Sequence, residues 1–440
     1  MKIAFAVLSV SLTTMVIAGE SWPSFQNGGN TDRIREDTFS LDDIKWTVDL
    51  QGYGQSSPIV WQGVVYTTTV KGDNKEQCYV TAHQLSDGKQ LWQYMVTNAS
   101  PFTNTNYVSR AAPSPVADSE GIVCLFEGGN LVALSHNGTV RWERNLVTDY
   151  GEVEARHGLA ASLEQNTNSV FAWIERSDDP YVVCLNKVTG NVKWKSAGAG
   201  ATSWSSPRLV PVDDVQHLVL SASGKILGVD PKTGKHLWTF DKISGNTTPT
   251  PIPLGDGRFL IGASAGRGAS AGTRAPESNG VVQISDNKNG SWSATFVWHA
   301  KRATSSFGSP VVHAGMAYFV NRAGVLYGLE MDTGKEIFAK RLTGSTWATP
   351  ISVGQQILFF GRDGKINMLH LDETPSAVSI WDELPVSREA TPQNTDAPRS
   401  PGGSGPVLYA AVWCEDILIL RRGNRLFAVN TKSKGDSKAP

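Results

Sequence analysis

Aromatic and basic side chains recur at comparable places along this chain, and their types favour binding over catalysis. Three aromatic residues each lie three positions before a proline: Trp204, Phe307 and Trp347. Predicted loops also carry Arg110, Arg267, Arg274, Arg322, Arg362, His157, Asp149, Glu152 and Glu154. Because Trp and Arg dominate the binding energy of interfaces, we expect a contact surface formed by Trp204, Phe307, Trp347, Arg110, His157, Arg322 and Arg362. Aromatic residues that only fill gaps in the packing, and solvated or paired arginines, are the alternatives.

The sequence offers no clear catalytic or metal-binding cluster. It contains no His-Glu-x-x-His pair, no Walker loop and no dinucleotide fingerprint. The eight histidines are scattered, and we expect His83 and His136 at the surface, on or near hairpins. We therefore predict no catalytic residue and no bound metal. The four cysteines have no CxxC spacing, and burial in strands is favoured over a disulfide: Cys78, Cys124, Cys184 and Cys414.

Composition excludes several function classes. The 440 residues include 40 basic and 41 acidic side chains, so no electrostatic footprint for nucleic acid or an anionic membrane surface exists. The 43 glycines and 14 tryptophans suit many tight turns and a repeated aromatic packing position.

The N-terminus has the pattern of a signal peptide over residues 1–18. Lys2 is followed by an apolar run and by small residues up to Ala18. The run is shorter than the roughly 20 residues that a membrane-spanning helix requires. No cysteine follows it directly, so we expect an exported chain that is not lipid-anchored, with a lead segment at residues 19–43.

The contact residues must be positioned by a repeated element, seen best at residues 224–238. Alternating apolar residues there predict a hairpin whose turn contains Pro231 and Gly234 and whose second strand ends on Trp238. Related copies recur every 40 to 60 residues along the chain. A period of about 40–50 residues with four strands is typical of a β-propeller blade. We expect the closing aromatic residues to dock neighbouring blades: Trp46, Trp92, Trp142, Trp194, Trp238, Trp298, Phe338 and Trp381.

The two ends of the repeat region predict closure of the ring. A Ser-Pro or Thr-Pro pair begins the innermost strand of most units, while the C-terminal unit lacks a fourth strand. Trp46 lies in a strand that has no unit before it. Joining these parts removes the exposed edges of an open array. We therefore predict an all-β fold, an eight-bladed propeller at residues 44–430, followed by a flexible tail at 431–440.

The repeat resembles that of pyrroloquinoline-quinone-like (PQQ-like) propellers, with its best copies at residues 226–238 and 325–338. Residues 22–27, Trp-Pro-Ser-Phe-Gln-Asn, resemble the Trp-Pro-x-Phe-Arg-Gly start of exported bacterial members, with Gln26 and Asn27 in place of Arg and Gly. The resemblance implies a periplasmic or secreted bacterial protein.

That family contains two functional classes. Its quinoprotein alcohol dehydrogenases are longer, place their quinone beside a disulfide between adjacent cysteines, and hold calcium with carboxylate and amide ligands. This chain has no adjacent cysteines and no clear calcium cluster. The other class consists of non-catalytic scaffolds, such as the outer-membrane assembly lipoprotein propeller. We therefore expect a monomeric, non-catalytic scaffold with a protein partner in the cell envelope and no cofactor; a quinone-dependent oxidoreductase with PQQ and calcium, or a carbohydrate-binding module using Trp204 and Trp347, are the alternatives.

Long predicted loops all fall on one face of such a ring. They connect strand four of one blade to strand one of the next, or strand two to strand three, at residues 97–112, 147–157, 264–279 and 383–405. The hairpins with the Thr-Gly-Lys turns lie on the opposite face and stay short. Because added loop length commonly carries function, we expect the contact residues at the channel mouth on the long-loop face.

Overall fold

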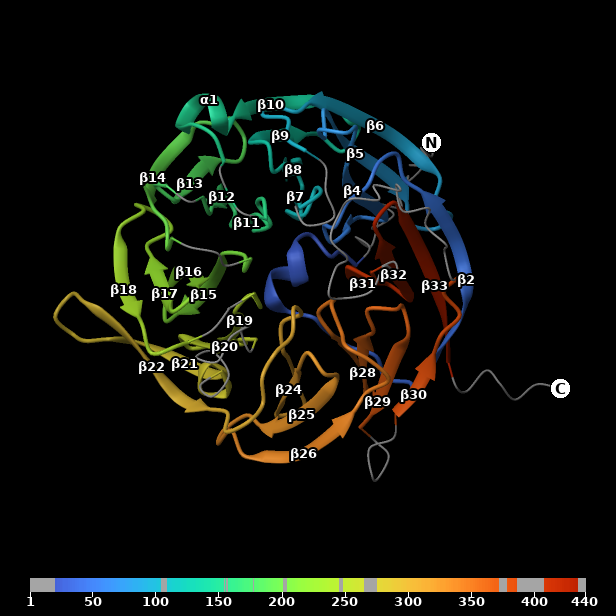
Figure 1. Cartoon of the computed structure of the whole chain (residues 1–440), viewed down its shortest axis with the longest axis vertical. Helices are drawn as coiled ribbons and strands as arrows, with labels where there is room; N and C mark the ends of the chain where they lie inside the picture. The colour runs from blue at the N-terminus through green and yellow to red at the C-terminus, as the bar shows by residue number, and fades with distance from the viewer. Residues whose placement is uncertain are drawn as a thin grey trace, which may run out of the picture.

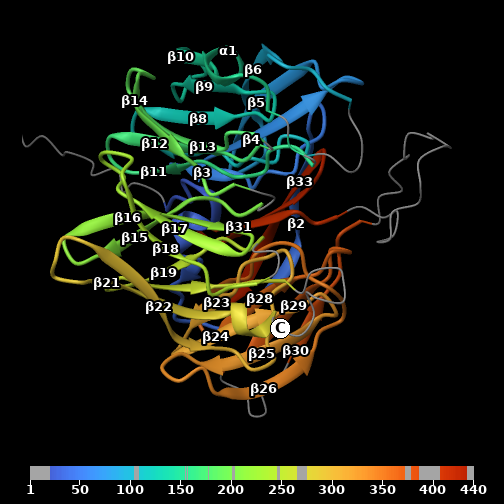
Figure 2. The ribbon, with the colours of Figure 1, turned by 60° about the vertical axis from the view of Figure 1, so that its left-hand side comes forward.

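A ring of eight blades surrounds a central channel in the computed structural model (Figure 1). The structure describes residues 20–103, 109–153, 155, 157–176, 178–200, 204–244, 248–264, 275–371, 378–385 and 407–433. Each blade is a sheet built on four antiparallel strands, and the rotated view in Figure 2 shows the blades following one another around the channel. The predicted eight-bladed β-propeller is confirmed. The predicted signal peptide lies outside the described residues.

Each blade runs from an innermost strand at the channel to an outermost strand at the rim. Blades 1 and 2 comprise β3 (Ile59–Trp61), β4 (Val64–Lys71), β5 (Gln77–Gln84), β6 (Gln90–Thr97), β7 (Val116–Asp118), β8 (Gly121–Leu125), β9 (Asn130–Leu134) and β10 (Val140–Asn145). Blades 3 and 4 comprise β11 (Glu164–Gln165), β12 (Ser169–Ile174), β13 (Tyr181–Asn186), β14 (Val192–Ala197), β15 (Arg208–Val212), β16 (Val215–Ala222), β17 (Lys225–Val229) and β18 (His236–Phe240). The helix α1 (Leu146–Tyr150) follows β10.

The second half of the ring repeats this order. Blades 5 and 6 comprise β19 (Ile252–Gly255), β20 (Arg258–Ile261), β21 (Gly280–Asp286), β22 (Trp292–His299), β23 (Val311–His313), β24 (Met316–Val320), β25 (Val325–Glu330) and β26 (Glu336–Arg341). Blades 7 and 8 comprise β27 (Ile351–Val353), β28 (Gln356–Phe360), β29 (Ile366–His370), β30 (Val378–Trp381), β31 (Ala410–Cys414), β32 (Ile417–Arg422), β33 (Arg425–Ser433) and β2 (Phe39–Asp49).

Burial follows position within the blade. All residues of the inner strands β8 and β12 are buried, whereas burial alternates along the outermost strand β14. The inner strands read as continuous apolar runs because neighbouring blades cover both faces of each sheet. All four cysteines are free and buried, each in a different blade. No helix in the described part of the chain is long and apolar enough to cross a membrane.

The N-terminal strand β2 closes the ring, as predicted. It pairs antiparallel with β33, and Trp46 lies opposite Ala428. The strand begins at Phe39, five residues before the start expected from the sequence. Figure 1 shows β2, in blue, beside the red C-terminal strands of blade 8.

Tryptophan rings dock most blades onto the turn of the next, whereas Phe338 of blade 6 lies against Gly328 of its own blade. The Trp194 Nε1 donates to the Pro231 carbonyl oxygen at 3.1 Å, and a Cβ added at Gly234 would lie 2.7 Å from the Trp194 ring. Gly234 also has a φ of +75°, so both the backbone conformation and the contact with the Trp194 ring require glycine at this position. The same pairing of a tryptophan with a glycine of the following blade recurs at Trp46 and Gly88, Trp92 and Gly138, Trp142 and Gly190, and Trp298 and Gly334. Trp381 donates to the Asp42 carbonyl oxygen of blade 8.

Trp238 is an exception that uses a buried histidine. No atom of the described residues lies within 4 Å of a Cβ built on Gly290 in the next blade's turn. The Trp238 Nε1 instead donates to His217 Nδ1 at 3.0 Å within its own blade. Burial lowers the pKa of His217 to about 4. The expectation that His83 lies at the surface was wrong: its side chain is 1% exposed on β5, and burial lowers its pKa to about 4 too.

The docking geometry predicts unequal costs for two glycine substitutions in blade 4. Gly224→Ala meets no atom within 4 Å in the part of the chain that the structure describes, at a φ of +79°, so it should cost only the left-handed backbone penalty of about 1–2 kcal/mol. Gly234→Ala must also displace the Trp194 ring, which adds roughly 1–3 kcal/mol of overpacking. Urea unfolding of both variants measures the difference; equal losses would contradict the docking role of Gly234.

His217 predicts a loss of stability on acidification. Its pKa is lower when folded, about 4, than in the unfolded chain, about 6.5, so the unfolded state takes up the proton first. Stability should fall between pH 6.5 and pH 4 and then level off, by up to about 1.4 kcal/mol per unit of pKa difference. His217→Gln keeps an acceptor for Trp238 without titrating. Thermal unfolding across this pH range should show a shallower decline for that variant, with His83 among the groups that contribute the remainder.

Candidate binding site in the central channel

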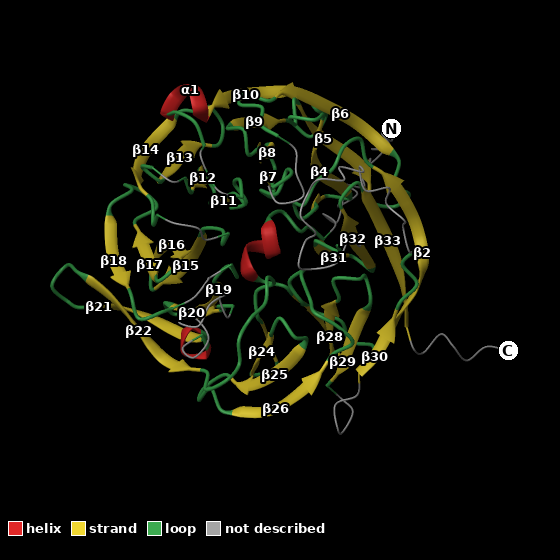
Figure 3. Ribbon diagram, in the orientation of Figure 1, coloured by secondary structure: helices red, strands yellow, loops and turns green. Residues whose placement is uncertain are grey.

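The N-terminal segment forms the floor of the channel. Trp22 exchanges two backbone hydrogen bonds with Val60 of β3, at 2.8 and 2.9 Å, and Ala117 of blade 2 donates to the Pro23 carbonyl oxygen. The short 3-10 helix η1 (Phe25–Gly29) then crosses the channel, where Figure 3 shows it at the centre of the ring. Strand β1 (Asp32–Arg33) pairs in parallel with β27 of blade 7. One polypeptide segment thus connects blades 1 and 2 with blade 7.

Gln26 joins this floor to the walls. Its backbone adopts a φ of 55°, a left-handed conformation that is uncommon for a residue other than glycine. Its Nε2 donates to Ser309 Oγ and Thr349 Oγ1, both at 2.8 Å, and its Oε1 accepts from Arg208 at 3.1 Å. Arg208 also forms a buried ion pair with Glu164 at 3.2 Å. The side-chain amide of Gln26 is therefore paired with the wall.

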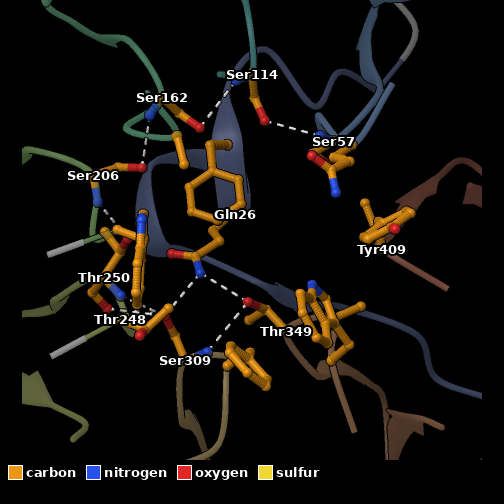
Figure 4. Close-up of a pocket in the computed structure, with 18 of the residues that line it drawn as sticks. Gln26, Ser57, Ser114, Ser162, Ser206, Thr248, Thr250, Ser309, Thr349 and Tyr409 are labelled. Carbon is orange, nitrogen blue, oxygen red and sulfur yellow. Dashed lines mark hydrogen bonds between the residues drawn. The ribbon is translucent and has the colours of Figure 1, made fainter. Parts of the chain in front are cut away.

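A chain of hydroxyl groups forms the waist of the channel. The backbone N–H of one residue donates to the hydroxyl oxygen of the equivalent residue in the next blade, at 2.8–3.4 Å (Figure 4). The participants run in order through Ser57, Ser114, Ser162, Ser206, Thr250, Ser309 and Thr349. By strand register, the corresponding position in blade 8 is Ala410, which has no hydroxyl group and interrupts the chain. The Ser-Pro and Thr-Pro pairs noted in the sequence therefore serve the channel as well as the strand starts.

A cavity of about 910 Å³ lies above this floor and waist. Its walls include Trp204, Phe307, Trp347, Tyr409 and Arg322, and its floor includes Trp22, Phe25 and Gln26. These wall residues precede an innermost strand or, for Arg322, connect the second and third strands of a blade. The mouth therefore opens on the face where the fourth strand of one blade connects to the first strand of the next.

Four aromatic rings form a continuous arc at the mouth. Phe307 stacks on Trp347 with ring centroids 4.0 Å apart, Tyr409 meets Trp347 edge-on at 5.9 Å, and Tyr53 meets Tyr409 edge-on at 6.2 Å. An arginine lies against three of the rings: Arg322 on Phe307, Arg362 on Trp347, and Arg110 on Tyr53 at 3.5 Å. We call these seven residues the aromatic–arginine arc.

The structure brings most predicted contact residues together. Phe307, Trp347, Arg110, Arg322 and Arg362 all lie in the arc. Trp204 and His157 form a second cluster on the cavity wall, with centroids 5.5 Å apart. Asp149 pairs with Arg144, and Glu152 accepts from Ser100, so both carry structural contacts instead. Arg267, Arg274 and Glu154 lie outside the described residues.

Several site residues carried no signal strong enough to be found in the sequence. Tyr53 and Tyr409 lie in loops without the proline spacing, and Ser162 lacks the proline that marks the other starts.

Residues 262–266 also match the Gly-x-Ser-x-Gly pattern, and Ser264 lines the cavity. In serine hydrolases that pattern forms a turn from a strand into a helix. Here it follows β20 and precedes β21 of the same antiparallel blade, which does not match that context.

The ring and its channel site define a class: a closed propeller whose axial cavity is lined by aromatic and hydroxyl side chains. A family model described as "Outer membrane protein assembly factor BamB" matches residues 40–175 and 155–256. The chain belongs to the PQQ-like β-propeller family. A search of curated proteins finds no match.

Solved structures with the same fold have diverse titles. BamB from Moraxella catarrhalis is 13% identical with a TM-score of 0.59, covering 89% of this chain and 98% of its own. A europium-containing methanol dehydrogenase is 10% identical with a TM-score of 0.62, covering 93% and 98%. The computationally designed protein Ika8 is 10% identical with a TM-score of 0.57, covering 88% and 100%. Likeness at these identities shows the fold alone.

The cavity does not fit a calcium–quinone site. Calcium takes carboxylate and carbonyl oxygens, but no Asp or Glu is among the described residues that line the cavity. The described part of the chain also has no group of three His, Cys, Asp or Glu residues that could hold a metal. The cysteines lie in four separate blades, so none can form an adjacent-cysteine disulfide beside the cavity.

The hydroxyl chain predicts a specific pattern of stability changes. Ser206→Ala removes the acceptor for the Ser162 N–H, a group buried between blades, and should cost about 1–3 kcal/mol. Ser206→Thr should restore most of that loss, because Thr250 already accepts the equivalent bond at 2.9 Å. Urea unfolding measures both variants. If threonine were as destabilising as alanine, the hydrogen bond would not be the cause.

Proposed function

We propose that this protein is an exported, non-catalytic scaffold that binds a protein partner in the cell envelope through the channel mouth. The observation that carries the proposal is the aromatic–arginine arc, in which four rings and three guanidinium groups converge on one face. Tyrosine, tryptophan and arginine are the residues enriched at interface hot spots. The family model's description as an outer membrane assembly factor is consistent with this proposal.

The arc is pre-organised for contact. Each ring is partly buried against its neighbours, and Arg362 is held through its backbone N–H, which donates to Ser345 at 2.8 Å. None of the arc arginines forms a salt bridge with a carboxylate of the described residues. Rigid aromatic anchors lose little conformational entropy on binding, so this surface suits a specific partner.

Two alternatives have weaker support. A quinone-dependent oxidoreductase shares the fold, but the cavity lacks the carboxylates for calcium. A carbohydrate-binding module would need open ring faces, and Phe307 covers one face of Trp347. We propose that the protein functions without PQQ or calcium.

Site-specific photo-crosslinking tests the proposal in the native envelope. A photo-reactive amino acid in place of the exposed Ala323, beside Arg322, should give a discrete protein adduct, identified by mass spectrometry. The combined change R322Q and R362Q should reduce that adduct about tenfold, as expected when two hot-spot residues are lost. The same amino acid in place of the exposed Lys232, on the opposite hairpin face, should give no such adduct.

A parallel measurement separates the scaffold from the enzyme. Purified protein mixed with PQQ and calcium should show neither stoichiometric quinone absorbance nor dye-linked alcohol oxidation. Turnover, or equal adducts from both crosslinking positions, would refute the scaffold proposal.

A further inference from the structure

The cavity presents hydrogen-bond donors and positive charge, with no acidic side chain among its described lining residues. Arg322 and His157 are the basic side chains of the wall. Two further donors are buried against the cavity and have no hydrogen-bond partner among the described residues: Trp22 Nε1, on a side chain 1% exposed, and Ser109 Oγ, on a residue 7% exposed. Both atoms have almost no accessible surface, so a ligand reaches them only if these side chains turn toward the cavity.

The hydroxyl chain adds donors around the waist. Ser114, Ser162 and Ser206 each accept a backbone N–H through the hydroxyl oxygen. A hydroxyl group carries one proton as well as two lone pairs. In the part of the chain that the structure describes, none of these three protons has an assigned acceptor, so each is available to a ligand in the cavity.

A buried charge lies behind the arc. Arg421 is 0% exposed, and its guanidinium donates to the carbonyl oxygens of Ser56, Thr68 and Gly423. It forms no salt bridge within the described ranges. Burial lowers the pKa of Arg421 to about 9, which leaves it charged at neutral pH. Its field in a low-dielectric wall favours an anion in the neighbouring cavity.

The channel already binds an extended polypeptide, its own N-terminal segment. Innermost strands of blades 1 and 7 pair with Trp22 and with β1 through backbone hydrogen bonds. Backbone pairing of this kind is a general mode of peptide recognition. The cavity above the floor is continuous with the arc, which offers a larger surface than a small acid requires.

We infer that the central cavity is the binding site for an extended acidic peptide segment of the partner. The carboxylates of the peptide contact the hydroxyl chain and Arg322, and its apolar side chains pack on the aromatic rings of the arc. This assignment rests on the proposed scaffold function and names the chemistry of the partner. A free aromatic acid shares that chemistry, and the experiment separates the two.

Fluorescence anisotropy with a labelled peptide tests the inference on the purified protein. The probe is an alternating glutamate–phenylalanine peptide of about eight residues, which reaches roughly 26 Å when extended. It should bind about tenfold more tightly than the matching glutamine–phenylalanine peptide, and raising salt to about 0.5 M should weaken it because the exposed arginines are screened. Equal affinity of the two peptides would overturn the inference.

Variants locate the bound peptide. A160W fills the cavity from a partly exposed wall position outside the hydroxyl chain and should reduce binding about tenfold; A112F provides a second filling variant if the first does not fold. R322Q should weaken binding severalfold. R258Q should not, since Arg258 lies in the β19–β20 hairpin of the opposite face and likewise has no salt bridge among the described residues.

Two outcomes contradict the inference without affecting the scaffold proposal. Wild-type affinity of both filling variants would place the peptide outside the cavity, and displacement by an equal concentration of free 4-hydroxybenzoate would make the cavity a small-molecule site. In either case the Ala323 crosslinks would still report on the partner. If the photo-reactive residue at position 323 gave no protein adduct while the purified protein still bound the peptide, the proposed function would be contradicted instead.

Discussion

The packing of a tryptophan side chain onto the glycine of the next blade's turn is the contact on which the closed propeller depends. Five of the eight closing aromatic rings both fill the gap between two sheets and donate an Nε1 proton to a turn carbonyl oxygen, as Trp194 does toward Pro231. The glycine must lack a side chain and must adopt a positive φ, so two independent demands fix one residue. Blade spacing follows from this contact, and the channel diameter follows from blade spacing.

Closure by β2 converts that series of contacts into a ring. Without the pairing of Trp46 opposite Ala428, blade 8 would present an unpaired edge and Trp46 could not reach Gly88 of blade 1. The residues that precede β2 lie inside the ring, so the N-terminal region that closes the rim also forms the channel floor. Stability of the ring and shape of the site are therefore linked through residues 20–49.

The sequence predicted the features that repeat and missed those that occur once. The period of the closing aromatics gave eight blades, because each copy faces the same packing demand. Trp204, Phe307 and Trp347 were found for a related reason, since blade register places equivalent residues at the channel mouth. Gln26 carried no such signal: its partners Ser309 and Thr349 are about three hundred positions away, at separations of 283 and 323 residues. The role of His217 could not be predicted either. It accepts the Nε1 proton of Trp238 because the turn of blade 5 does not supply the usual docking contact.

The interrupted hydroxyl chain shows how a repeated fold acquires an individual site. A strict eightfold repeat would place a hydroxyl group at every blade and make the waist symmetric. At blade 8 the register instead gives Ala410, and beside it the arc residues Tyr409 and Tyr53 cover the buried Arg421. One sector of the channel is thus apolar in front and cationic behind, while the opposite sector remains lined by hydroxyl groups. A ligand that fits this asymmetry must combine an apolar group with hydrogen-bond acceptors, and its orientation is determined by the one blade that departs from the repeat.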